Sequence, residues 1–137
     1  MVRYPPTVQP RRDDKTLVSS IDLAPTILKV CGLEPTDDMT GIDLLDDKAL
    51  KSRNRIYGEI FSHDVVDVDL PAASLRYRWV IQENWKLIVP QPPLVTDEPT
   101  QLYDLSEDPH ELNNLASQDA PRVTTLRKAL DGWWNGE

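Results

Sequence analysis

The chain has 137 residues, of which 39% are hydrophobic and 28% are charged, enough for one globular domain with a core of its own. Its formal net charge of −8 argues against nucleic acid as a partner, because phosphate groups would be repelled. No apolar run approaches the roughly 20 residues of a membrane-spanning helix, so we expect no membrane partner. A lone cysteine, Cys31, excludes an internal disulfide, and no signal peptide is visible after Met1.

Residues 1–14 carry no periodicity and should be extended and mobile. Residues 15–20 are rich enough in β-branched side chains for a short strand. The next stretch predicts a helix over 22–31, with Asp22 as its N-cap and Gly32 as its left-handed C-cap. Asp22 could instead be a carboxylate ligand, but the role of helix cap is favoured over that of a ligand. The helix carries one apolar face, formed by Leu23, Ile27, Val30 and Cys31.

A loop over 33–45 precedes one or two helical turns over 46–52. Five aspartates cluster in this region, and their spacing fits no EF-hand loop. A solvated acidic loop is therefore favoured over a metal site. The residues concerned are Asp37, Asp38, Asp43, Asp46 and Asp47.

Four strands are predicted in sequence, over 55–62, 75–82, 85–89 and 101–105, with Glu83 and Asn84 as a two-residue turn. No helix between them is long enough for a crossover, which favours an antiparallel meander. A helix over 121–133, capped by Asp119, should then lay an apolar stripe on the sheet. The stripe consists of Val123, Leu126, Leu130 and Trp133. The fold class is thus α+β.

Two further sets of polar residues have alternative interpretations. His63 and Asp64 follow a strand end beside a long loop, where a general base or a substrate contact could lie; a surface histidine is the simpler alternative. Arg78 and Lys86 lie within strands and should be solvated or should pair with the strand-edge carboxylates Glu59 and Asp104.

Residues 102–116 read LYDLSEDPHELNNLA. They resemble the signature L-Y-D-L-x-x-D-P-x-E-x-x-N-L-A near the C-terminus of sulfatases of the alkaline-phosphatase superfamily. Residues 17–32, with the Thr40–Leu45 stretch that follows, resemble the family segment D-x-x-P-T-x-L-x-x-x-G … G-x-S-L. The hairpin over 78–88 is also similar to the family's R-x-x-x-x-x-x-K-L-I pattern.

The resemblance implies that residues 1–45 are an edge strand and helix of a larger catalytic α/β domain, and that residues 46–137 are the C-terminal subdomain. The family uses Ca²⁺ and a formylglycine made within a C/S-x-P-x-R motif. That motif is absent, since Cys31 is followed by Gly-Leu-Glu-Pro, and no residue maps onto a family nucleophile or metal ligand. We therefore expect a C-terminal sulfatase fragment that is inactive alone.

In the family, the loop that corresponds to His63 and Asp64 approaches the substrate cleft, so these two residues are the candidate cleft contacts. The expected partner is the missing N-terminal catalytic domain, and a homodimer through the face of Leu23 and Ile27 is the expected outcome in isolation. Family members are often periplasmic, secreted or lysosomal. A phosphodiesterase or phosphonate-ester hydrolase fragment, and a standalone interaction module, are the alternatives.

Overall fold

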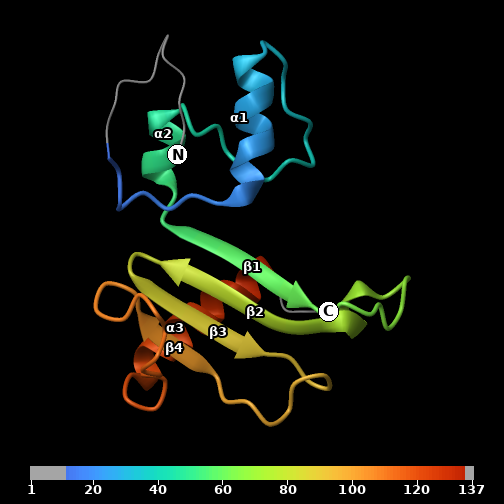
Figure 1. Ribbon diagram of the computed structural model, residues 1–137, viewed down its shortest axis with the longest axis vertical. Coiled ribbons are helices and arrows are strands. Elements are labelled where there is room, and N and C mark those ends of the chain that lie inside the picture. Colours follow the sequence, from blue (N-terminus) through green and yellow to red (C-terminus); the bar gives the residue numbers. More distant parts are fainter. Residues whose placement is uncertain (1–11, 135–137) are drawn as a thin grey trace. The chain divides into compact units, whose positions relative to one another are not determined.

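The computed structural model describes residues 12–134 (Figure 1), so most of the prediction for residues 1–14 lies outside the described residues. Its contacts divide the chain into two units, Met1–Asn54 and Arg55–Glu137. The predicted division at residue 45, which concerns the domains of a whole sulfatase, stays a prediction. In the described part of the chain, no helix has the length and apolarity needed to cross a membrane.

The first unit is built from two short α-helices joined by a loop. A 3-10 turn, η1 (Ser20–Asp22), leads into α1 (Leu23–Val30), and α2 (Asp47–Ser52) follows the acidic loop. Gly32 has φ 73°, and the Leu33 N–H bonds to the Leu28 carbonyl at 2.9 Å, which closes α1 as the sequence predicts. The predicted strand over 15–20 is wrong, since this segment has no ladder partner among the described residues, is irregular as far as Ser19 and enters η1 at Ser20.

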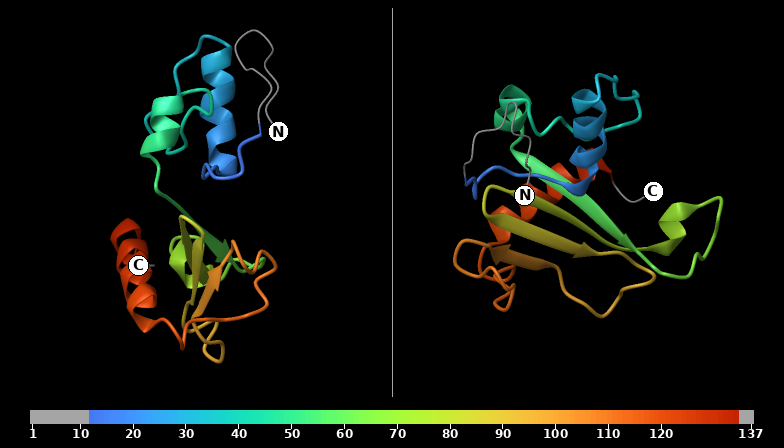
Figure 2. Two further views of the ribbon diagram at one scale, coloured as in Figure 1. Left: turned by 90° about the vertical axis from the view of Figure 1, so that its left-hand side faces the viewer. Right: turned by 45° about the horizontal axis from the view of Figure 1, so that its top comes forward.

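The second unit is a four-stranded antiparallel sheet in the order β1-β2-β3-β4, covered by one helix (Figures 1 and 2). The predicted fold class is confirmed, and the predicted strands agree with the observed ones to within a residue at each end. The elements are β1 (Arg55–Phe61), η2 (Pro71–Ser74), β2 (Leu75–Gln82), β3 (Trp85–Pro90), β4 (Gln101–Asp104) and α3 (Ala120–Trp133).

The core of this unit lies between the sheet and α3. Val80, Leu87 and Leu102 are opposite one another on adjacent strands, and all three are fully buried. Leu126 and Leu130 of α3 pack onto them, as the helical stripe predicts. The predicted cap of α3 is also confirmed, since the Asp119 carboxylate accepts from the Arg122 N–H at 3.1 Å. The apolar side chains of the strands, which repeat every two residues, and those of α3, which repeat every 3.6 residues, therefore pack into one core.

Candidate functional site

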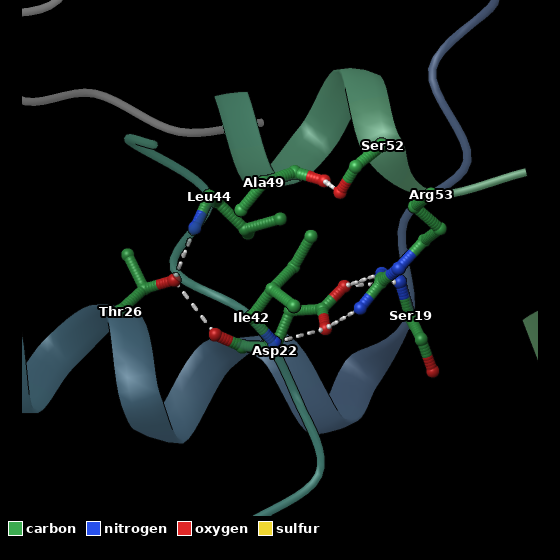
Figure 3. Close-up of polar contacts among 8 residues, drawn as sticks. All are labelled: Ser19, Asp22, Thr26, Ile42, Leu44, Ala49, Ser52 and Arg53. Atoms are coloured by element: carbon green, nitrogen blue, oxygen red, sulfur yellow. Dashed lines mark hydrogen bonds and ion pairs between the residues drawn. The ribbon is translucent and has the colours of Figure 1, made fainter. Parts of the chain in front are cut away.

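The first candidate site is a buried ion pair in the first unit (Figure 3). Asp22 has no exposed surface, and its two carboxylate oxygens lie 2.5 and 2.7 Å from the Arg53 guanidinium nitrogens. The same oxygens accept from the Ser19 and Ile42 backbone N–H groups at 2.8 and 2.9 Å. The carboxylate therefore connects η1, the acidic loop and the end of α2 within this unit.

Asp22 is the N-cap residue of α1, as predicted, but its side chain does not cap the helix. Its side chain makes no capping bond to α1, because the 3-10 turn before the helix directs the carboxylate to Ser19 and to Arg53 instead. Thr26 extends the same network: its hydroxyl donates to the Asp22 carbonyl at 2.7 Å and accepts from the Leu44 N–H at 2.8 Å. Both carboxylate oxygens are occupied, so this is a structural ion pair.

The ion pair predicts a pH dependence of stability. Burial raises the pKa of the Asp22 carboxyl, but hydrogen bonds from Arg53, Ile42 and Ser19 outweigh it and hold the pKa below the ordinary value of 3.8. The unfolded chain therefore binds the proton first as the pH falls, so the stabilisation is present above about pH 4 and is lost as the pH falls through the lower folded-state pKa. Acid titration of amide exchange in α1 should show this loss, and the Asp22→Asn variant should lack that component.

A close backbone approach holds the loop against this site. A Cβ on Gly41 would lie 2.2 Å from the Ile21 carbonyl oxygen and 3.0 Å from the Asp22 Cα. Gly41→Ala should therefore push the loop away from Asp22 and cost about 1–3 kcal/mol in the free energy of unfolding, measured by urea denaturation. Gly132→Ala is the matched control, because nothing lies within 4 Å of its Cβ position. Equal stability of the two variants would contradict the close packing.

The second candidate site is the signature loop over 102–116, which the structure shows as a hydrogen-bonded turn. The Asp104 carboxylate accepts from the Ser106 N–H and hydroxyl at 3.0 and 2.6 Å. Asp108 accepts from the Asn113 N–H at 2.8 Å. Because these short polar side chains bond to nearby backbone, their spacing determines the path of the loop.

Asn114 attaches the loop to the outer edge of the sheet. Its side-chain oxygen accepts from the Leu102 and Ala116 N–H groups, and its amide donates to the Thr100 carbonyl, all at 2.9–3.1 Å. An edge strand otherwise presents unpaired N–H and C=O groups. The Asn114 side chain provides hydrogen-bond partners for such groups at the outer edge of β4.

Asn114→Ala should cost about 1–3 kcal/mol, because it leaves partly buried backbone groups without partners. Asn113→Ala is the matched control, since Asn113 is exposed and bonds through its backbone. Urea unfolding followed by tryptophan fluorescence measures both. Equal midpoints for the two variants would show that Asn114 does not hold the edge.

Two cations of the sheet have partners other than the predicted ones. Arg78 has 4% exposure and pairs with Asp131 of α3 at 3.0 Å, while it also donates to the Trp134 carbonyl. Lys86 pairs with Glu111 of the signature loop at 2.7 Å. Both predictions, solvated side chains or pairs with Glu59 and Asp104, are wrong. The two cations connect the sheet to α3 and to the signature loop.

His63 and Asp64, the predicted cleft contacts, lie just after β1. The His63 Nδ1 is 3.8 Å from an Asp64 carboxylate oxygen, and both side chains are fully exposed. No general-base geometry with a third group is present among the described residues around them. Their role toward a substrate stays a prediction.

The acidic residues of the first unit serve local structure. Asp46 caps α2 by accepting from the Lys48 and Ala49 N–H groups, and Asp43 accepts from the Leu45 N–H. Within residues 12–134, no three His, Cys, Asp or Glu side chains gather into a group that could hold a metal ion.

Three features together define the C-terminal region of a sulfatase. They are a D-x-x-P-T helix, an antiparallel four-stranded sheet with one covering helix, and a polar signature loop between β4 and α3. The family model described as "N-sulphoglucosamine sulphohydrolase, C-terminal" matches residues 1–132. The chain belongs to this family.

Known relatives are consistent with this assignment. Arylsulfatase K of Xenopus laevis is 28% identical over 131 residues, which cover 91% of this chain and 24% of the relative. An ulvan-active sulfatase of Formosa agariphila is 25% identical and covers 97% of this chain and 28% of its own length. The solved structure of yidJ from Bacteroides fragilis, described as a candidate sulfatase, is 26% identical with a TM-score of 0.69, over 97% of this chain and 28% of that one. The chain thus spans about a quarter of the length of these relatives.

Proposed function

We propose that this chain acts as the C-terminal part of a sulfuric ester hydrolase, supporting a catalytic part without performing the chemistry itself. The observation that carries the proposal is the family match over residues 1–132, in a chain that covers only 24% and 28% of two curated sulfatases. Both of these relatives are named sulfatases, which favours a sulfate ester over the phosphonate-ester alternative. The Ca²⁺ and formylglycine of the family would belong to the catalytic part.

Exposed apolar side chains support a role within a larger enzyme. In α1, the predicted apolar face is uncovered, since Leu23 is 52% and Ile27 is 60% exposed. In the segments just before and after α1, Val18, Ile21 and Leu33 are also more than half exposed. Several exposed large apolar side chains in one short region are typical of a contact with another chain or domain, here the catalytic part. A homodimer through the same face is the arrangement we expect of the isolated chain.

The loop between β1 and η2 supports the proposed contact of His63 and Asp64 with the substrate cleft. Val65, Val66 and Val68 in this loop are 66%, 61% and 85% exposed, and three aspartates lie among them in the sequence. An exposed loop that is both apolar and acidic, held at the end of a rigid strand, is suited to contacting a neighbouring surface or a ligand. We propose that His63 contacts the substrate away from the sulfate group.

A chimera tests the proposal. The matched residues of the Formosa agariphila ulvan-active sulfatase are replaced by this chain, and hydrolysis of ulvan sulfate esters is measured. We expect activity from the chimera and none from the same sulfatase without a C-terminal part. His63→Ala should raise KM with little change in kcat if His63 contacts only the bound substrate. His110→Ala, an exposed histidine of the signature loop, is the matched control. A folded chimera without activity would contradict the proposed function.

A further inference from the structure

Four aromatic side chains gather where the end of α3 meets β1. The rings of Tyr57 and Trp133 are stacked, with centroids 5.0 Å apart and planes within 8° of each other. Trp134 lies edge-on to Trp133 at 6.3 Å, and it is 6.3 Å from Phe61 with the two planes tilted by 34°. The ring contacts thus run in one series from Tyr57 through both tryptophans to Phe61. We call these four residues the aromatic cluster.

The aromatic cluster reaches the surface instead of closing the core. Trp133 is the last member of the apolar stripe that the sequence predicts for α3, yet it is 43% exposed, and Phe61 is 40% exposed. By contrast, Leu126 and Leu130 of the same helix are 3% and 0% exposed. Large apolar side chains that remain together at the surface are typical of a binding surface.

The rings of the aromatic cluster are held in place by the rest of the unit. Trp133 is stacked on Tyr57, which packs against the buried core. Trp134 is fixed through its backbone, because its carbonyl accepts a hydrogen bond from the buried Arg78 guanidinium. A surface that is already ordered loses little conformational freedom when a ligand binds to it.

Glu59 supplies a hydrogen-bond acceptor beside the rings. It is two residues from Tyr57 on β1, so the two side chains point to the same face of the strand. Glu59 is exposed, and within residues 12–134 its carboxylate has no hydrogen-bond or ion-pair partner. The cation opposite Glu59 in the sheet is Arg78, which is buried and paired with Asp131 at 3.0 Å. Glu59 is therefore left to accept from a ligand, and it disfavours a ligand that is itself negative.

Exposed rings beside a carboxylate favour one class of ligand. A sugar ring has a face of C–H groups, which packs on an aromatic ring, and hydroxyl groups at its rim, which donate to a carboxylate. A nucleotide also stacks on aromatic rings, but its phosphates would be repelled by Glu59 and by the net charge of −8. Sulfated and carboxylated sugars are disfavoured by the same charges. A neutral sugar satisfies all of these observations.

We propose that the aromatic cluster binds a neutral pyranose unit of a saccharide chain. The C–H face of the sugar packs on Trp133, and one of its hydroxyl groups donates to Glu59. The rings that continue to Phe61 contact the next unit of the chain. Tyr57 is a positioning residue, because it holds the Trp133 ring. This binding involves no sulfate ester and only residues of this chain, so it goes beyond the proposed function and does not depend on it.

NMR titration of the isotope-labelled chain with neutral hexasaccharides tests the proposal. The probes are cellohexaose, mannohexaose and xylohexaose, and the readout is the indole N–H signal of each tryptophan. We expect the Trp133 and Trp134 signals to shift with at least one probe, while those of Trp79 and Trp85 remain unchanged. Trp133→Ala should abolish the shift of the Trp134 signal. Unchanged Trp79 and Trp85 signals in this variant show that it is folded.

A conservative pair of variants tests the carboxylate. Glu59→Gln should weaken binding several-fold, because a hydrogen bond to a charged acceptor becomes a neutral one. Glu83→Gln, which changes an exposed carboxylate in the turn between β2 and β3, is the matched control and should leave the dissociation constant unchanged. Equal dissociation constants for the two variants, or no indole shift with any probe, would overturn the proposal.

Two further outcomes would also overturn the proposal. A heparin hexasaccharide that shifts the Trp133 and Trp134 signals at lower concentration than the neutral probes would show that the site prefers an anionic sugar. A shift of these signals with protein concentration, in the absence of sugar, would identify the aromatic cluster as a contact between two copies of this chain.

Discussion

Asp22→Asn should destabilise the first unit by about 3–5 kcal/mol, because it leaves the Arg53 guanidinium buried without its counter-charge. The Arg53 side chain is 12% exposed and that of Asp22 is fully buried, so water cannot replace the lost partner. The second unit contains all four tryptophans, so fluorescence does not report this loss. Hydrogen exchange of the α1 and α2 amides does, and it should accelerate roughly a hundredfold or more.

The matched control for Asp22 is Glu34, which pairs with Lys29 on the surface. The Glu34 carboxylate is 82% exposed, and exposed pairs contribute little to stability. Glu34→Gln should therefore leave amide exchange in α1 nearly unchanged. If Asp22→Asn behaved like Glu34→Gln, the buried ion pair would not be what holds η1, the acidic loop and α2 together.

Leu87→Ala should cost about 2–5 kcal/mol in the free energy of unfolding of the second unit, from lost burial and the cavity left behind. Leu87 is fully buried and stands between Val80 and Leu102 in the register of the sheet. Urea denaturation followed by tryptophan fluorescence measures the change. Leu112→Ala, at an 85% exposed site, should shift the midpoint little. A cost below about 1 kcal/mol for Leu87→Ala would mean that the core lies elsewhere.

The sheet and α3 could be predicted from sequence because their signals are local. Apolar alternation over 75–89 with a turn at Glu83 and Asn84 predicts β2 and β3, and the stripe that includes Leu126 and Leu130 predicts the packed face of α3. Both periodicities depend only on neighbours within a few positions. The signature over 102–116 likewise depends on turn chemistry that is encoded within the loop itself.

The polar contacts could not be predicted because they join residues far apart in sequence. Arg53 lies 31 positions after Asp22, and nothing around either residue identifies the other, so a cap was the better local interpretation of Asp22. From the sequence, Arg78 and Lys86 are expected to be solvated or to pair with carboxylates on adjacent strands, whereas their partners come from α3 and the signature loop. The expected strand over 15–20 failed for a related reason: β propensity forms a strand only where a partner strand is present.

The most direct test of the central claim is an assay of the purified chain with an aryl sulfate, with and without Ca²⁺. If the ester-cleaving groups lie in the catalytic part, turnover should not exceed that of buffer under either condition. Ca²⁺-dependent hydrolysis by this chain alone, abolished by His63→Ala, would contradict the account.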